Sequence, residues 1–180
     1  MGEPNGGWKP WLMSKLSLLH IWAVSLAMPT PNEPNKDEWV REMERSIGEP
    51  DEDIFLVGHS LGSPAILRYL EKLPENSKIG GVVLVSSPSE ILHSEKPESK
   101  LRKIDNFLDK PFDFEHIKKV CNNFVVIHGD NDDRVPFKHG EKIAASLNCN
   151  LISVAGGGHL NEFYNIYELP EALEVLTEMI

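Results

Sequence analysis

IFLVGHSLG, at residues 54–62, decides the fold class of this chain. Its first four residues form an apolar run of strand length, and GHSLG, at residues 58–62, matches the pattern G-x-S-x-G. Residues 61–73 then place apolar side chains at the spacing that is typical of a helix. A strand that passes through this pattern into a helix predicts a sharp turn with Ser60 at its tip.

The rest of the chain repeats this alternation of short strands and helices. Further strands are predicted at residues 20–26, 81–85, 124–127 and 151–154. Helices are predicted at residues 8–17, 37–47, 138–147 and 168–180, with one more near residues 101–108. Most of the strands are continuous apolar runs, which indicates burial on both faces. The sequence therefore predicts a single α/β domain over residues 1–180, with a mostly parallel central sheet and helices on both faces.

The composition argues against several classes of partner. Among the 180 residues, 28 acidic and 18 basic side chains leave a net charge of −10. Such a chain would be repelled by nucleic-acid phosphates and by anionic lipids, so we expect no nucleic acid and no membrane as partner. The apolar run at residues 16–28 is too short to span a bilayer, and we interpret it as a helix that leads into a strand. Cys121 and Cys149 are too few for a disulfide framework, so we expect reduced thiols and a cytoplasmic location.

Ser60 is the candidate nucleophile. A serine at a strained strand-to-helix turn holds its hydroxyl above the sheet, and glycines two residues before and after it would allow the neighbouring backbone to come close. The helix that follows directs its first N–H groups to the same place, so the amide of Leu61 is a candidate donor to an oxyanion. The alternative is that Ser60 only caps the start of a helix.

A serine nucleophile needs a base and a carboxylate that orients the base. The strand at residues 124–127 is followed by three candidate acids, Asp130, Asp132 and Asp133. All three could instead be solvated turn residues, because aspartate favours turns. The residues alone leave the choice among the three open.

His159 is the candidate base. It follows the strand at residues 151–154 after three glycines, which would let an imidazole approach another backbone closely. The alternative is a histidine on a surface loop. The remaining histidines lie beside the serine, before the acidic turn or away from the predicted strand ends, and they are His20, His59, His93, His116, His128 and His139. The order serine, aspartate, histidine is the order found in α/β-hydrolases.

Here the chain resembles the retinoblastoma-binding-protein-9-like family of small serine hydrolases, within the α/β-hydrolase superfamily. The motifs that carry the resemblance are GHSLG, HGDNDDRVP at residues 128–136, GGGHL at residues 156–160 and WKPWL at residues 8–12. The family pattern G-x-x-D-x-x-V-P selects Asp132 among the three aspartates. The resemblance implies a minimal α/β-hydrolase fold and a triad of Ser60, Asp132 and His159. It also implies hydrolysis of small ester or amide substrates, without a cofactor or a metal.

The start of the chain departs from the family pattern. Family members begin with a strand that ends in a His-Gly turn and lies in mid-sheet, between the strands predicted here at residues 20–26 and 54–57. No such strand precedes residues 1–7, so we expect the first strand to be absent and the chain to be truncated at its N-terminus relative to the family. An alternative function follows from this absence, that of a catalytically impaired homologue that acts as a binding protein. Leu101, Ile104 and Phe107 are candidates for an apolar wall of the substrate pocket, or else core residues.

Overall fold

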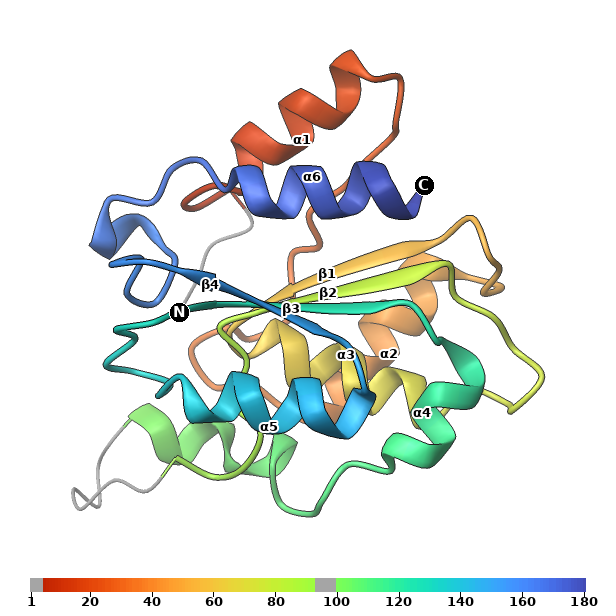
Figure 1. The fold of residues 1–180 in the computed structure, drawn as a ribbon. Coiled ribbons are helices and arrows are strands. Elements are labelled where there is room, and N and C mark those ends of the chain that lie inside the picture. The colour runs from red at the N-terminus through yellow and green to blue at the C-terminus, as the bar shows by residue number, and fades with distance from the viewer. Residues whose placement is uncertain (1–4, 93–99) are drawn as a thin grey trace.

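Four parallel strands form the central sheet (Figure 1). The computed structural model describes residues 5–92 and 100–180. In chain order the strands are β1 (Phe55–His59), β2 (Gly81–Val85), β3 (Phe124–Gly129) and β4 (Asn150–Val154). They lie side by side in the same order, β1-β2-β3-β4. The predicted parallel α/β architecture is therefore confirmed.

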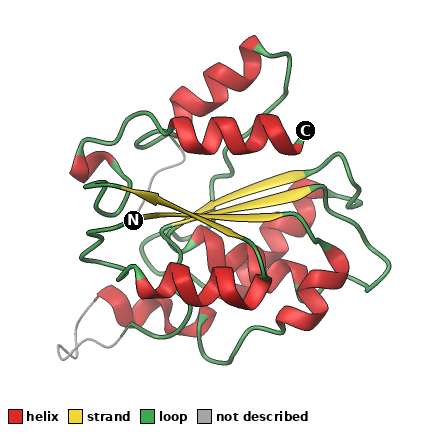
Figure 2. Ribbon diagram, viewed as in Figure 1, coloured by secondary structure: helices red, strands yellow, loops and turns green. Residues whose placement is uncertain are grey.

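Helices cover both faces of this sheet (Figures 1 and 2). On one face lie α1 (Lys9–Leu18) and α6 (Pro170–Met179). The other face is covered by α2 (Lys36–Ile47), α3 (Gly62–Leu70), α4 (Phe114–Val120) and α5 (Lys138–Leu147). Two 3₁₀ helices complete the described elements, η1 (Lys100–Phe107) and η2 (Glu162–Tyr164). In the described residues, no helix is long and apolar enough to cross a membrane.

The two faces of β2 explain why its sequence is apolar throughout. Val82 and Leu84 belong to the core that packs under α2, α3 and α5, whereas Val83 and Val85 belong to the core under α1 and α6. All four side chains are fully buried. Successive side chains of a strand point to opposite faces, so a central strand between two helical layers needs an apolar residue at every position.

The prediction of a strand at residues 20–26 is wrong. This segment runs without regular secondary structure past the outer edge of β1, and in the sheet of the described residues β1 pairs with β2 only. Its side chains nevertheless alternate as in a strand, because Ile21 and Ala23 pack on the core while Trp22 and Val24 are 86% and 58% exposed. Among the described residues no strand precedes β1.

A buried guanidinium ties α3 to the segment that follows η1. The side chain of Arg68 is 3% exposed and donates to the carbonyl oxygens of Phe107 and Lys110, and its Nη1 lies 2.9 Å from the Glu71 carboxylate. The ring of Phe112 lies 4.2 Å from the guanidinium carbon. Removing one partner of a buried ion pair leaves an uncompensated charge, which costs more than the pair itself contributes.

We therefore expect Arg68→Met to lower the free energy of unfolding by about 3 kcal/mol. Urea titration followed by circular dichroism measures this change. Arg45→Met is the matched control, because it breaks an arginine–glutamate pair of the same i,i+3 spacing on an exposed surface. If Arg45→Met were as unstable as Arg68→Met, burial would not be the reason why losing the Arg68–Glu71 pair is costly.

Candidate functional site

Ser60 lies at a strained turn between β1 and α3. Its backbone φ angle is +53°, in the left-handed region that residues other than glycine rarely adopt. The turn is held by the Ser60 N–H, which donates to the carbonyl of Val85 over 2.8 Å, and by the Ser63 hydroxyl, which donates to the carbonyl of Gly58 over 2.9 Å. The sharp turn predicted at GHSLG is present. Leu61 follows directly as the residue that caps α3, so its amide belongs to the end of the helix whose N–H groups lack intrahelical acceptors.

The two glycines of the motif have different roles. A Cβ atom on Gly58 would lie 2.7 Å from the backbone nitrogen and Cα of Ser63, so only glycine allows α3 to pack this closely on β1. A Cβ atom on Gly62 would meet nothing within 4 Å. The expectation that both glycines are needed for close approach is therefore wrong for Gly62.

His159 reaches Ser60 from the loop that follows β4. Its Nε2 lies 2.9 Å from the Ser60 Oγ, and its side chain is buried. The loop approaches β3 so closely that a Cβ atom on Gly129 would lie 2.1 Å from the carbonyl oxygen of Gly158. The φ angle of Gly158 itself is +54°, so glycine is favoured at both contacting positions.

Asp132 lies on the far side of the same imidazole. Its Oδ2 is 2.8 Å from the His159 Nδ1, and its Oδ1 accepts hydrogen bonds from the backbone N–H groups of Arg134 and Val135, each at 2.9 Å. Burial of the carboxyl favours its neutral form, but the hydrogen bond to His159 and the two backbone donors outweigh burial and lower the pKa of Asp132. An ionised carboxylate in this position holds the imidazole with Nδ1 as the donor and Nε2 free to accept from Ser60.

The other two candidate acids stabilise neighbouring loops instead. Asp130 accepts a hydrogen bond from the backbone N–H of Gly156 over 2.8 Å, and Asp133 accepts one from the hydroxyl of Tyr164. Neither carboxylate contacts His159 in the described hydrogen bonds. The geometry thus brings together Ser60, His159 and Asp132, and it assigns Asp130 and Asp133 to loop contacts.

Comparison with known proteins places this chain in a family. A family model described as serine hydrolase matches residues 2–178. YdeN of Bacillus subtilis, named as a hydrolase, is 34% identical over 170 residues, which cover 94% of this chain and 86% of that protein. The chain belongs to the serine hydrolase family. The serine hydrolase RBBP9 of Rattus norvegicus is 25% identical over 175 residues, covering 97% of this chain and 87% of that protein.

Solved structures agree with this assignment. The crystal structure of the ydeN gene product from B. subtilis superimposes with a TM-score of 0.91 at 32% identity, covering 99% of this chain and 92% of that one. A YdeN-like hydrolase from Pectobacterium atrosepticum shares the fold with a TM-score of 0.68 at 20% identity. The family and its relatives YdeN and RBBP9 support a hydrolytic function, and the solved structures confirm the α/β-hydrolase fold.

Two further histidines, which no sequence pattern singled out, support the site of this family member. The Nε2 of His59 is 2.9 Å from the carbonyl oxygen of His159, and that of His128 is 2.8 Å from the carbonyl oxygen of Val135. Burial, and then the closeness of the His159 imidazole, lower the pKa of His59 to about 3, so the His59 ring is neutral at physiological pH. A neutral His59 ring with its proton on Nε2 can donate a hydrogen bond to the backbone carbonyl of His159, which helps to hold His159 in place.

Two of the residues predicted to form a pocket wall belong to the core. Phe107 is fully buried and its ring lies 5.3 Å from that of Trp39. Ile104 belongs to the same core, and it also lines the cavity that contacts Ser60. The side chain of Leu101 lies outside the described residues. In the described part of the chain, no group of three or more histidine, cysteine or acidic side chains could hold a metal ion.

The unequal roles of the two motif glycines give a direct test. We expect Gly58→Ala to destabilise the protein by about 1–3 kcal/mol, because α3 must move away from β1 to accept the methyl group. Gly62→Ala should leave the thermal midpoint unchanged or slightly raised, since alanine is the better helix former and has open space there. Differential scanning calorimetry measures the thermal midpoints of the two variants. Equal destabilisation by both substitutions would contradict the unequal roles of Gly58 and Gly62.

Proposed function

We propose that this protein is a carboxylesterase-like serine hydrolase that cleaves ester or amide bonds of small substrates through an acyl-enzyme intermediate. The observation that carries the proposal is the continuous chain of hydrogen bonds from the Ser60 hydroxyl through His159 to Asp132. A serine hydroxyl is a weak nucleophile alone and becomes reactive when a base takes its proton during attack. This chain of bonds supplies the base and the group that orients it.

In the proposed reaction, the Ser60 Oγ attacks the acyl carbon as its proton passes to the His159 Nε2. Asp132 stabilises the imidazolium that forms. The amide of Leu61 donates to the oxyanion of the tetrahedral intermediate, in the role of a helix-end N–H. His159 then gives its proton to the leaving alcohol or amine as the bond to it breaks. A water molecule releases the acyl group by the same steps, and Ser60 recovers its proton.

The surroundings of Ser60 favour a substrate with an apolar acyl group. The cavity beside it is lined by Leu26, Met43, Leu61, Ala65 and other apolar residues. A small acyl chain would gain free energy from leaving water there.

The two cysteines fit the cytoplasmic location that we propose for the enzyme. Both are free, and burial raises the pKa of Cys121 and of Cys149 to about 11. They therefore remain protonated and unreactive at physiological pH. The absence of nucleic-acid and membrane partners stays a prediction from the net charge of −10.

Labelling with a fluorophosphonate tests the nucleophile. We expect Ser60→Ala to abolish labelling and His159→Ala to remove nearly all of it, because no base then activates the hydroxyl. Ser86→Ala is the matched control, since Ser86 also has a left-handed backbone (φ +47°) after a strand but its hydroxyl is fully buried. Persistent labelling of Ser60→Ala would falsify the assignment.

The choice of the acid has its own test. Asp132→Asn should lower kcat on a p-nitrophenyl ester by about 10⁴, because the amide holds the imidazole in the wrong tautomer. Asp130→Asn and Asp133→Asn keep similar side chains that do not contact His159, so each should cost far less. If either control variant is as inactive as Asp132→Asn, the acid is wrongly assigned.

A further inference from the structure

Trp8, the first residue of the motif WKPWL, lies beside the loop that carries His159. Its side chain is buried, and its Nε1–H donates to the carbonyl oxygen of Leu160 over 2.8 Å. Leu160 follows His159 directly in the sequence. The indole thus joins the start of α1 to the backbone next to the proposed base.

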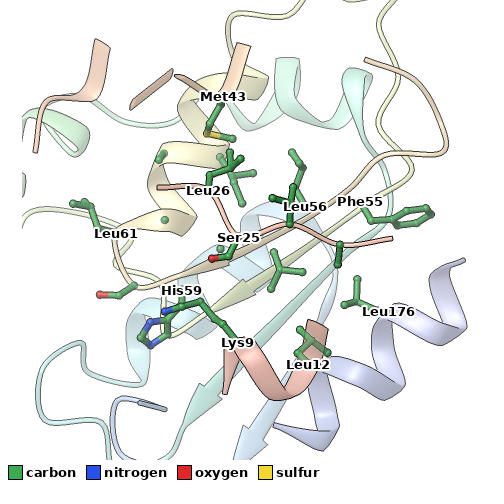
Figure 3. Close-up of a pocket in the computed structure, with 18 of the residues that line it drawn as sticks. Lys9, Leu12, Ser25, Leu26, Met43, Phe55, Leu56, His59, Leu61 and Leu176 are labelled. Carbon is green, nitrogen blue, oxygen red and sulfur yellow. The ribbon is translucent and has the colours of Figure 1, made fainter. Parts of the chain in front are cut away.

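A second buried side chain holds the preceding carbonyl. The Nε2 of His59 lies 2.9 Å from the carbonyl oxygen of His159. Figure 3 shows His59 beside the start of α1, where Lys9 is labelled. The rings of Trp8 and His59 meet edge to face, with their centroids 5.9 Å apart and their planes at 84°. Two neighbouring rings therefore hold two consecutive carbonyls, and we name Trp8 and His59 the base clamp.

The backbone held by the base clamp is strained. Leu160 has a φ angle of +47°, in the left-handed region that a leucine rarely adopts. Its N–H donates to the carbonyl of Gly157 over 3.1 Å, and its side chain is fully buried in the same core as Trp8. A residue keeps such a conformation only where its surroundings hold it. The hydrogen bond from Trp8 is one of the contacts that hold this turn.

The indole is itself fixed by the packing of α1. Leu12 and Leu16 of this helix are buried in the core that α1 shares with α6. The residue before Trp8 also lies against the loop, because a Cβ atom on Gly7 would be 3.2 Å from the carboxylate of Glu162. A side chain on a packed element places its partner more precisely than one on a free loop.

We propose that Trp8 is a positioning residue, which acts with His59 to keep the imidazole of His159 within reach of Ser60. The inference rests on the proposed function. The His159 Nε2 lies 2.9 Å from the Ser60 Oγ, and a misplacement of about 1 Å can lower the rate of an enzyme by about 10²-fold. Among the described hydrogen bonds, Trp8 contacts neither reacting side chain, so it acts through the backbone of the base loop.

A structural role alone is the alternative, because a buried tryptophan N–H usually finds an acceptor. Trp39 is the matched control for this alternative. It is also buried, its Nε1–H donates to the carbonyl of Pro29 over 2.8 Å, and its ring meets that of Phe107 edge to face at 5.3 Å. Trp39 lies on α2, on the opposite face of the sheet from α1, and its hydrogen bond does not involve the base loop.

Replacing each tryptophan by benzothienylalanine tests the role of its N–H, since this residue keeps the two-ring shape with a sulfur in place of the N–H. At position 8, kcat on p-nitrophenyl acetate should fall roughly tenfold or more while KM changes by less than about twofold. At position 39, kcat should stay within about twofold of the wild-type value. Trp8→Phe and Trp39→Phe repeat the comparison with natural residues.

Proton NMR gives a second readout that does not require turnover. The proton between the His159 Nδ1 and Asp132 should give a downfield signal, which Asp132→Asn identifies by removing it. A loosened imidazole exchanges this proton with water more rapidly. Benzothienylalanine at position 8 should therefore broaden or abolish the signal, whereas at position 39 it should leave the signal unchanged.

The proposal fails if the two positions lower kcat equally, or if the proton signal survives unchanged at position 8. Failure of the proposed function looks different, since ester turnover would then persist in Ser60→Ala. In that case the proton signal alone decides whether Trp8 positions His159.

Discussion

The left-handed turn at Ser60 is the constraint on which the rest of the site depends. Adopting this backbone costs free energy for a serine, and the cost is offset by the hydrogen bond from its N–H to Val85 and by the close packing that Gly58 permits. The turn fixes α3 against β1 and raises the hydroxyl at the carboxyl end of the sheet. Because all four strands are parallel, the loops after β3 and β4 end at the same edge, which is why His159 and Asp132 converge there.

The loops that carry the proposed base and the proposed acid are hydrogen-bonded to each other as well as to the sheet. Asp130 and Asn131, in the loop after β3, accept hydrogen bonds from the backbone of Gly156 and Gly158, in the loop after β4. His59, from the end of β1, contacts the carbonyl of His159. The distances among the three side chains of the proposed triad are thus set by a network of neighbouring contacts, which limits the freedom of an imidazole on a glycine-rich loop.

Much of this was predictable from the sequence, and each failure has a physical reason. The apolar runs of β1 to β4 and the G-x-S-x-G turn depend on local patterns, which a single sequence carries. The choice of Asp132 came only from the resemblance to a family, because three aspartates in one turn look alike until the position of His159 is known. The strand predicted at residues 20–26 failed because alternation describes side chains, whereas a strand also needs a partner at its edge. That a side chain at position 62 would meet no neighbour could not be predicted, because it depends on the residues that surround Gly62 in space.

The central claim is that the turn at Ser60 makes this hydroxyl the nucleophile of a hydrolase that forms an acyl-enzyme. The most direct measurement mixes the protein with p-nitrophenyl acetate, quenches the reaction with acid during turnover and locates acetyl groups on its peptides by mass spectrometry. The mechanism predicts an acetyl group on the peptide that contains Ser60, together with release of p-nitrophenol. Turnover of the ester with Ser60 unmodified, or with the acetyl group on another residue, would contradict it.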